Sequence, residues 1–255
     1  MHVRDARAFA RLGAVYAALD ECVAFATEYD LRTAPAQPDH AALYLPEGKS
    51  LKDYLSDRAY QRLRRILHRT FGIDLDHHRR LRPLLLVNLI SEQLLAAEHP
   101  QPLDLHLWER AETAGKLLLG LENYQEQEAL LQRLPVEQQV RSLQAIGRHP
   151  ARFRRQVQSL ADRYTSGDLR ALYQATRRRT GAARRVLIFE RNERLATRFD
   201  EVAQQQSLFA AVGAAHLPGG KGMLRLLKHA GYRLRPVQHR DSFHEGFPGC
   251  AITPP

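Results

Sequence analysis

The sequence contains little cysteine and no long hydrophobic run, and each shortage excludes a class of protein. Cysteine occurs only at Cys22 and Cys250, which is too little for a disulfide framework or a cysteine-based zinc site. No run approaches the ~20 apolar residues that span a bilayer, and the longest, residues 84–90, is interrupted by Asn88. We therefore expect no transmembrane segment, and we expect Cys22, which lies in an apolar stretch, to be a small core residue.

The sequence has fewer acidic than basic residues. It contains 28 Asp and Glu against 38 Lys and Arg, a net charge of +10. Such an excess occurs in proteins that bind nucleic acid or anionic membranes. However, most arginines are dispersed along predicted helices, as at Arg62, Arg65 and Arg69, which indicates a solvated face. Because no RNA- or DNA-binding motif accompanies the denser clusters of arginine, we do not expect nucleic acid as a partner. Binding to nucleic acid that weakens strongly with salt would support this alternative.

Residues 207–232 contain the most informative pattern in the chain. Their apolar run, residues 208–212, predicts a buried strand. A turn rich in glycine follows, and then a predicted helix that starts near Met223. In α/β proteins a buried strand that leads into a Gly-rich turn and a helix is where ligands bind, at the carboxyl end of the strand.

His216 lies in this turn, between Gly213 and Gly219. The backbone there can hold one imidazole nitrogen while the other contacts a substrate or a metal ion. We predict His216 as a metal ligand and Gly213 and Gly219 as substrate-binding residues. The alternative is an ordinary helix entry with a histidine on the surface.

Two predicted strands end in a glutamate. Glu28 lies near the end of residues 22–31, and Glu122 ends residues 116–122. A carboxylate at the end of a buried strand is costly unless it is paired or functional. Both are therefore candidate catalytic residues. The alternatives are a surface glutamate for Glu28 and, for Glu122, an acid beside a helix that Asn123 caps.

Arg191 and Asn192 follow a further predicted strand, residues 184–189. An arginine at the end of a strand can hold a carbonyl oxygen or a carboxylate, and an asparagine can orient a water molecule or a ligand. We predict both as catalytic residues. The alternative is that Asn192 caps the next helix and that Arg191 pairs with a surface acid.

These residues carry a resemblance to a known family. Residues 213–237, GAAHLPGGKGMLRLLKHAGYRLRPV, resemble the C-terminal motif of the TraB/GumN family, to which the TIKI proteases are related. That family is marked by two GxxH motifs and by an Arg-Asn pair before the second, where Arg191 and Asn192 stand here. Its acidic positions correspond to Glu28 and Glu122. His2 resembles the histidine of the first motif, whose glycine and preceding strand are absent.

The resemblance implies a metal-assisted hydrolase that acts on a peptide or small molecule. Manganese, cobalt or zinc would be held by His2 and His216, Glu28 or Glu122 would bind the metal or act as general base, and Arg191 would stabilise an oxyanion. Some TraB relatives are described as pheromone-shutdown factors, which implies a non-catalytic binding protein as the alternative. The incomplete first motif indicates a shortened N-terminus or a misassigned start, or else a disordered terminal histidine at position 2.

The order of the predicted elements indicates the fold class. Strands at both ends of the chain, with helices between them, predict a single α/β domain over residues 1–255. We expect a mixed sheet formed from both chain ends, with a long helical insertion at about residues 50–180, so that the histidines at positions 2 and 216 converge. The chain as given has no signal peptide, so the cytoplasm is the default compartment unless the N-terminus is truncated.

Overall fold

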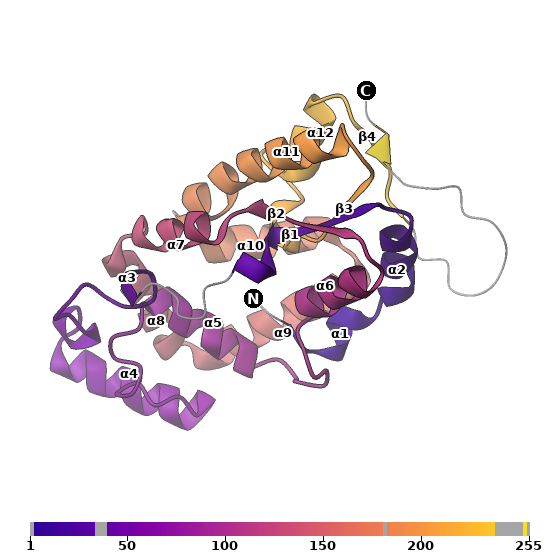
Figure 1. The fold of residues 1–255 in the computed structure, drawn as a ribbon. Coiled ribbons are helices and arrows are strands. Elements are labelled where there is room, and N and C mark those ends of the chain that lie inside the picture. The colour runs from indigo at the N-terminus through magenta and orange to yellow at the C-terminus, as the bar shows by residue number, and fades with distance from the viewer. Residues whose placement is uncertain (1–2, 34–39, 181–182, 238–251, 254–255) are drawn as a thin grey trace.

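The fold is built on a small parallel sheet (Figure 1). Its strands are β1 (Ala24–Tyr29), β2 (Leu117–Glu122) and β3 (Leu208–Ala210), in the order β2-β1-β3. The residues that the computed structural model describes are 3–33, 40–180, 183–237 and 252–253. The prediction of an α/β domain in which both chain ends contribute to one sheet is confirmed.

The prediction of a mixed sheet is wrong. β1 pairs in parallel with both β2 and β3, because the connections between these strands cross over through helices and not through hairpins. The last predicted strand does not join this sheet. Instead β4 (Arg233–Leu234) forms a separate antiparallel pair with β5 (Ile252–Thr253).

Helices cover both faces of the sheet (Figure 1). One face packs against α11 (Glu190–Ala203) and α12 (Met223–His229). The other packs against α2 (Leu12–Asp20) and α6 (Leu103–Thr113), where Trp108 and its neighbours are buried. A sheet enclosed in this way accounts for the continuous apolar strands.

The alternation of side chains along β1 directs Glu28 toward α11. Ala24 and Ala26 belong to the core beneath α11, whereas Phe25 belongs to the core beneath α6. Successive side chains of a strand point to opposite faces. Glu28, two residues after Ala26, therefore faces α11, as its contacts described below show.

A separate layer of helices extends from the sheet (Figure 1). It consists of α4 (Asp57–Phe71), α5 (Pro83–Gln93), α8 (Val136–Arg148) and α9 (Pro150–Ser166), packed around their own apolar core. The strand predicted at residues 116–122 is present as β2 within residues 50–180. Within the described part of the chain, no helix is long and apolar enough to cross a membrane.

Other helices are α1 (Ala6–Phe9), α3 (His40–Leu43), α7 (Tyr124–Gln132) and α10 (Leu169–Thr180), with short 3-10 helices at Leu31–Thr33, Leu51–Asp53 and Ala214–His216.

Residues 184–189 do not form the predicted strand. Arg185–Phe189 is a turn of π-helix that runs directly into α11. A short apolar run cannot be assigned to strand or helix by periodicity alone. Here Ile188 is the one residue of the turn that is buried, so the run does not form a core strand. π-helical turns occur frequently at functional sites.

Asp5 is a buried carboxylate that joins the first helix to the helical layer. It caps α1 and accepts hydrogen bonds from the backbone and side chain of Arg7 and from the N–H of Ala96. These bonds, chiefly those from the Arg7 side chain, lower its pKa from 3.8 to about 2. Because the pKa is lowered in the folded state, the stability that Asp5 contributes is present above about pH 4 and is lost as the pH falls toward 2.

We therefore expect Asp5→Asn to lower the free energy of unfolding at neutral pH, and the difference from the wild type to shrink as the pH falls below about 4. Urea unfolding over this pH range measures both. Asp162→Asn is the matched control, since Asp162 pairs with the same Arg7 but its side chain is 66% exposed, and it should change stability little. A difference for Asp5→Asn that does not vary with pH would contradict the prediction.

Candidate functional site

Residues from four distant segments meet at the carboxyl edge of the sheet. Glu28 comes from β1 and Glu122 ends β2. Arg191 and Asn192 lie in the first turn of α11, and His216 follows β3 in a 3-10 helix. The carboxyl ends of parallel strands lie on one edge, which explains the convergence. The structure thus brings together five of the six residues predicted as catalytic or metal-binding, and the other one, His2, lies outside the described residues.

Arg191 is at the centre of this cluster. Its Nη2 lies 2.5 Å from Glu28 Oε2, and its Nε lies 2.9 Å from Glu122 Oε2. Its Nη1 lies 3.2 Å from His216 Nε2. Burial by itself would lower the pKa of Arg191, but the two carboxylates raise it. The guanidinium therefore stays charged and links both acids to the histidine.

Glu28 is held as a carboxylate. Its Oε1 accepts a hydrogen bond of 2.7 Å from the N–H of Gly213. Burial by itself would raise its pKa, but His216 in its protonated form, the guanidinium of Arg191 and the N–H of Gly213 outweigh burial and hold the pKa at about 2. A carboxylate with such a low pKa is a weak proton acceptor. Its environment therefore favours a ligand or electrostatic role for Glu28 over that of a general base.

Glu122 is the most deeply buried acid of the cluster, with no exposed side-chain surface. Besides Arg191 it binds Arg194, whose Nη2 lies 3.0 Å from Oε1. Sequence reasoning missed Arg194, although its position three residues after Arg191 places both on one face of α11. Asn123 does cap α7 in a capping box with Glu126. Glu122 is thus both an acid beside a helix that Asn123 caps and a buried member of the cluster.

His216 is a buried, neutral imidazole of defined tautomer. Asn192 Nδ2 donates to the carbonyl oxygen of Lys221 at 2.6 Å, which fixes the amide orientation. Asn192 Oδ1 then accepts from His216 Nδ1 at 2.6 Å, so the proton is on Nδ1 and Nε2 keeps its lone pair. Burial lowers the pKa of His216 below 6.5. At neutral pH Nε2 therefore carries a lone pair, which faces Arg191 Nη1 and can accept another proton or bind a metal ion only in place of that contact.

Two alternatives from the sequence are wrong. His216 is only 4% exposed, so it is not a surface histidine. Asn192 does not cap α11, because it lies inside the helix and its side chain binds His216. The Lys221 carbonyl, which orients Asn192, could not be found from sequence, since any residue has a backbone carbonyl.

The two predicted glycines have structural reasons to be glycine. A Cβ on Gly213 would lie 2.9 Å from Glu28 Oε1, so glycine allows the backbone N–H to reach that carboxylate. Gly219 has a φ of 100°, and a Cβ there would lie 2.5 Å from the ring of Tyr173. Glycine is therefore required for the turn to pack against α10. Contact of either glycine with substrate stays a prediction.

Two side chains of the cluster carry atoms of the kind that bind metal ions. His216 Nε2 and Glu28 Oε1 are 3.9 Å apart, and both are donors that manganese, cobalt or zinc accept. Asn192 holds Nδ1 as outer-shell partners hold metal-bound histidines. However, Arg191 contacts His216 Nε2 and the other oxygen of Glu28, Oε2, while Glu28 Oε1 accepts from the N–H of Gly213. No group of three His, Cys, Asp or Glu side chains in the described ranges could hold a metal ion.

Comparison with known proteins gives one match. The model of the TraB/PrgY/gumN family matches residues 1–236. This range includes every segment of the cluster. Neither a curated protein nor a solved structure matches the chain.

Proposed function

Because the chain belongs to the TraB/PrgY/gumN family, we propose that it is a hydrolase whose reaction centre is the cluster of Glu28, Glu122, Arg191, Asn192 and His216. The observation that carries the proposal is the state of His216, a buried neutral imidazole with its lone pair on Nε2 beside a guanidinium. A general base close to a fixed positive charge is what the addition of water to a carbonyl group needs.

Each residue has a role that follows from its contacts. His216 Nε2 accepts a proton from water, and Asn192 keeps the ring in the required tautomer. Arg191 stabilises the negative charge that develops on the carbonyl oxygen. Glu28 and Glu122 hold Arg191 in position, and Glu28 is the more exposed of the two, at 25% of its side chain. A peptide or a small molecule would reach the cluster from the side of Glu28.

A divalent metal ion is part of the proposal. His216 Nε2 and Glu28 Oε1 would supply two of its ligands, in competition with Arg191 at Nε2 and with the N–H of Gly213 at Oε1. The resemblance implies His2 as a further ligand. When bound, manganese, cobalt or zinc would lower the pKa of a coordinated water molecule.

Hydrolysis of quenched fluorescent peptides tests the function, with each metal ion added separately and with a chelator. His216→Ala should lower kcat by about a hundredfold or more, the usual contribution of a general base. Asn192→Ala should lower kcat by about tenfold to a hundredfold through the wrong tautomer and ring orientation. The matched control is His149→Ala, an exposed histidine at the end of α8, which should leave kcat unchanged. Wild-type activity in His216→Ala would remove His216 from the mechanism.

A second function is favoured by the hydrogen bonding of Arg191. Its Nε, Nη1 and Nη2 all bind groups of the protein itself, on Glu122, His216 and Glu28. Such a cluster can also serve as a rigid structural support for a non-catalytic peptide or small-ligand binding protein. Binding of a peptide with no cleavage under any of the metal ions would favour this function over hydrolysis.

A further inference from the structure

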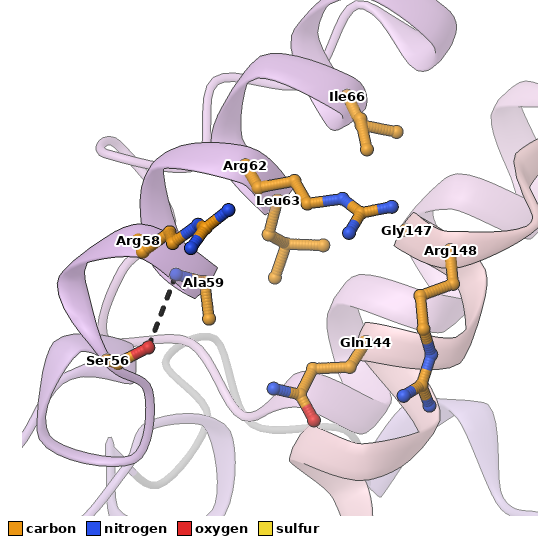
Figure 2. Close-up of a pocket in the computed structure, with 9 residues that line it drawn as sticks. All are labelled: Ser56, Arg58, Ala59, Arg62, Leu63, Ile66, Gln144, Gly147 and Arg148. Carbon is orange, nitrogen blue, oxygen red and sulfur yellow. Dashed lines mark hydrogen bonds between the residues drawn. The ribbon is translucent and has the colours of Figure 1, made fainter.

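A hollow of about 280 Å³ lies between α4 and α8 in the helical layer (Figure 2). None of the residues that line it belongs to the cluster at the edge of the sheet. Its size is close to the lower end of ligand pockets, about 300–1,000 Å³. Its lining residues are Ser56, Arg58, Ala59, Arg62, Leu63, Ile66, Gln144, Gly147 and Arg148.

Three arginines surround the hollow without an acidic residue among its lining. Arg58 and Arg62 come from α4, and Arg148 ends α8 (Figure 2). All three are exposed, and none forms an ion pair with another residue that the structure describes. Arg58 and Arg62 lie four residues apart on one face of α4, where like charges repel one another. A bound anion would relieve this repulsion and could receive two parallel hydrogen bonds from each guanidinium fork.

The floor of the hollow is apolar. Leu63 is buried there, with Ile66 and Ala59 beside it (Figure 2). Gly147 allows α8 to lie against this floor, because a Cβ at that position would lie 2.6 Å from Leu63 Cδ1. Ile66 is half-buried and lies outside the apolar core of the layer. An apolar group bound against it would be removed from water.

A second hollow on α4 lacks this combination. It has a volume of about 370 Å³ and is lined by polar residues that include Asp74. One of its arginines, Arg64, already pairs with Asp76 at 2.6 Å. Its positive charge is therefore partly neutralised, and it offers no apolar floor. Charge and apolar surface coincide in the first hollow.

We propose that the hollow between α4 and α8 binds a small amphiphilic anion, a phosphate or carboxylate head attached to a short apolar tail. The head contacts Arg58, Arg62 and Arg148, and the tail lies on Leu63 and Ile66. Gln144, which is half-buried and reaches toward the hollow (Figure 2), is placed to donate to the same head. This site is independent of the proposed hydrolase function.

Calorimetric titration with octyl phosphate, below its micelle concentration, tests the proposal. Inorganic phosphate supplies the head alone, and octyl glucoside supplies the tail with a neutral head. Octyl phosphate should bind at least about tenfold more tightly than either, since each half contributes binding energy. Equal affinity for octyl phosphate and inorganic phosphate would overturn the amphiphilic site.

Variants locate the binding. Arg62→Ser should weaken octyl phosphate binding by about tenfold or more. Arg62→Lys should weaken it less, because lysine keeps the positive charge but lacks the paired N–H donors of the guanidinium group. Ile66→Ser should reduce the affinity for octyl phosphate toward that for inorganic phosphate and leave the latter unchanged. Arg65→Ser is the matched control, since it removes an exposed charge of α4 that does not line this hollow.

Two results would overturn the site. An equal loss in Arg65→Ser and Arg62→Ser would mean diffuse attraction to a basic helix. Binding to vesicles that contain phosphatidic acid, without binding of soluble octyl phosphate, would mean a membrane surface and not a pocket. Circular dichroism of each variant establishes that an effect is not due to unfolding.

Discussion

Replacing Arg191 with methionine is expected to lower the free energy of unfolding by about 3–5 kcal/mol near neutral pH, the usual cost of removing one partner from a buried ion pair. The arginine side chain is only 12% exposed and bridges Glu28 and Glu122. Without it, Glu122 keeps only Arg194 as an ion-pair partner among the described residues, and Glu28 keeps the N–H of Gly213 and a neutral histidine. The buried Glu122 and the partly buried Glu28 then lack most of their compensating charge.

The effect of Arg191→Met should depend on pH with a defined sign. When Arg191 is absent, burial raises the pKa of Glu28, and protonation of Glu28 removes its unpaired charge. The difference in stability between wild type and variant should therefore shrink as the pH falls toward about 4. Urea unfolding at several pH values measures it. Adding Glu28→Gln and Glu122→Gln to the variant should recover part of the loss at neutral pH, because no buried charge remains unpaired.

Arg198→Met is the matched control for Arg191→Met. Arg198 lies on the same helix and pairs with Glu126 at 3.7 Å, but its side chain is 47% exposed. Such a surface pair contributes about 1 kcal/mol or less. A loss in Arg191→Met no larger than that in Arg198→Met would show that the cluster is not held together by its central guanidinium.

Gly120→Ala is expected to destabilise the protein by about 3 kcal/mol, the upper part of the range for overpacked sites. Gly120 lies in β2 opposite Thr27 of β1. A Cβ there would lie 2.2 Å from the backbone nitrogen of Asp30 and 2.8 Å from the carbonyl carbon of Tyr29. Because these are backbone atoms, no side-chain rotation relieves the clash, and the end of β1 must move.

Gly120→Ala should also disturb the candidate site, since Glu28 lies two residues before Asp30. We expect any hydrolytic activity or ligand binding of the cluster to fall with the stability, as measured by thermal unfolding and by the peptide assay. Gly13→Ala is the control, because a Cβ on Gly13 meets nothing within 4 Å and alanine favours the helix by about 0.5–1 kcal/mol. Equal stability of the two variants would contradict the clash.

Some helix ends are marked by local signals in the sequence. Ser56 and Gly72 mark the two ends of α4, where a hydroxyl accepts a backbone N–H and a left-handed residue ends the helix. The pattern failed at residues 184–189, where a short apolar run fits a strand or a helical turn equally well. It also failed for strand direction, because a strand has the same residue pattern whichever way its neighbour runs.

The candidate site was partly predictable for the same reason. A glutamate that ends an apolar strand stands out in a sequence, and so does a histidine in a glycine-rich turn. The groups that these side chains bind cannot be recognised in the sequence. The bridge of Arg191 between two acids, the second guanidinium of Arg194 and the orientation of Asn192 by the Lys221 carbonyl all join residues that are close only after folding.

The amino-acid sequence by itself determined the α/β class, the apolar strands, the residues at their ends and the membership in the TraB/PrgY/gumN family. Only the tertiary structure decided that the sheet is parallel, that His216 is buried and neutral, and that Arg191 is the charge around which the acids gather. The physical reason is the separation along the chain over which each interaction acts. Propensity, capping and side-chain alternation act between neighbouring residues, whereas burial and ion pairing depend on distances between segments that the fold alone sets.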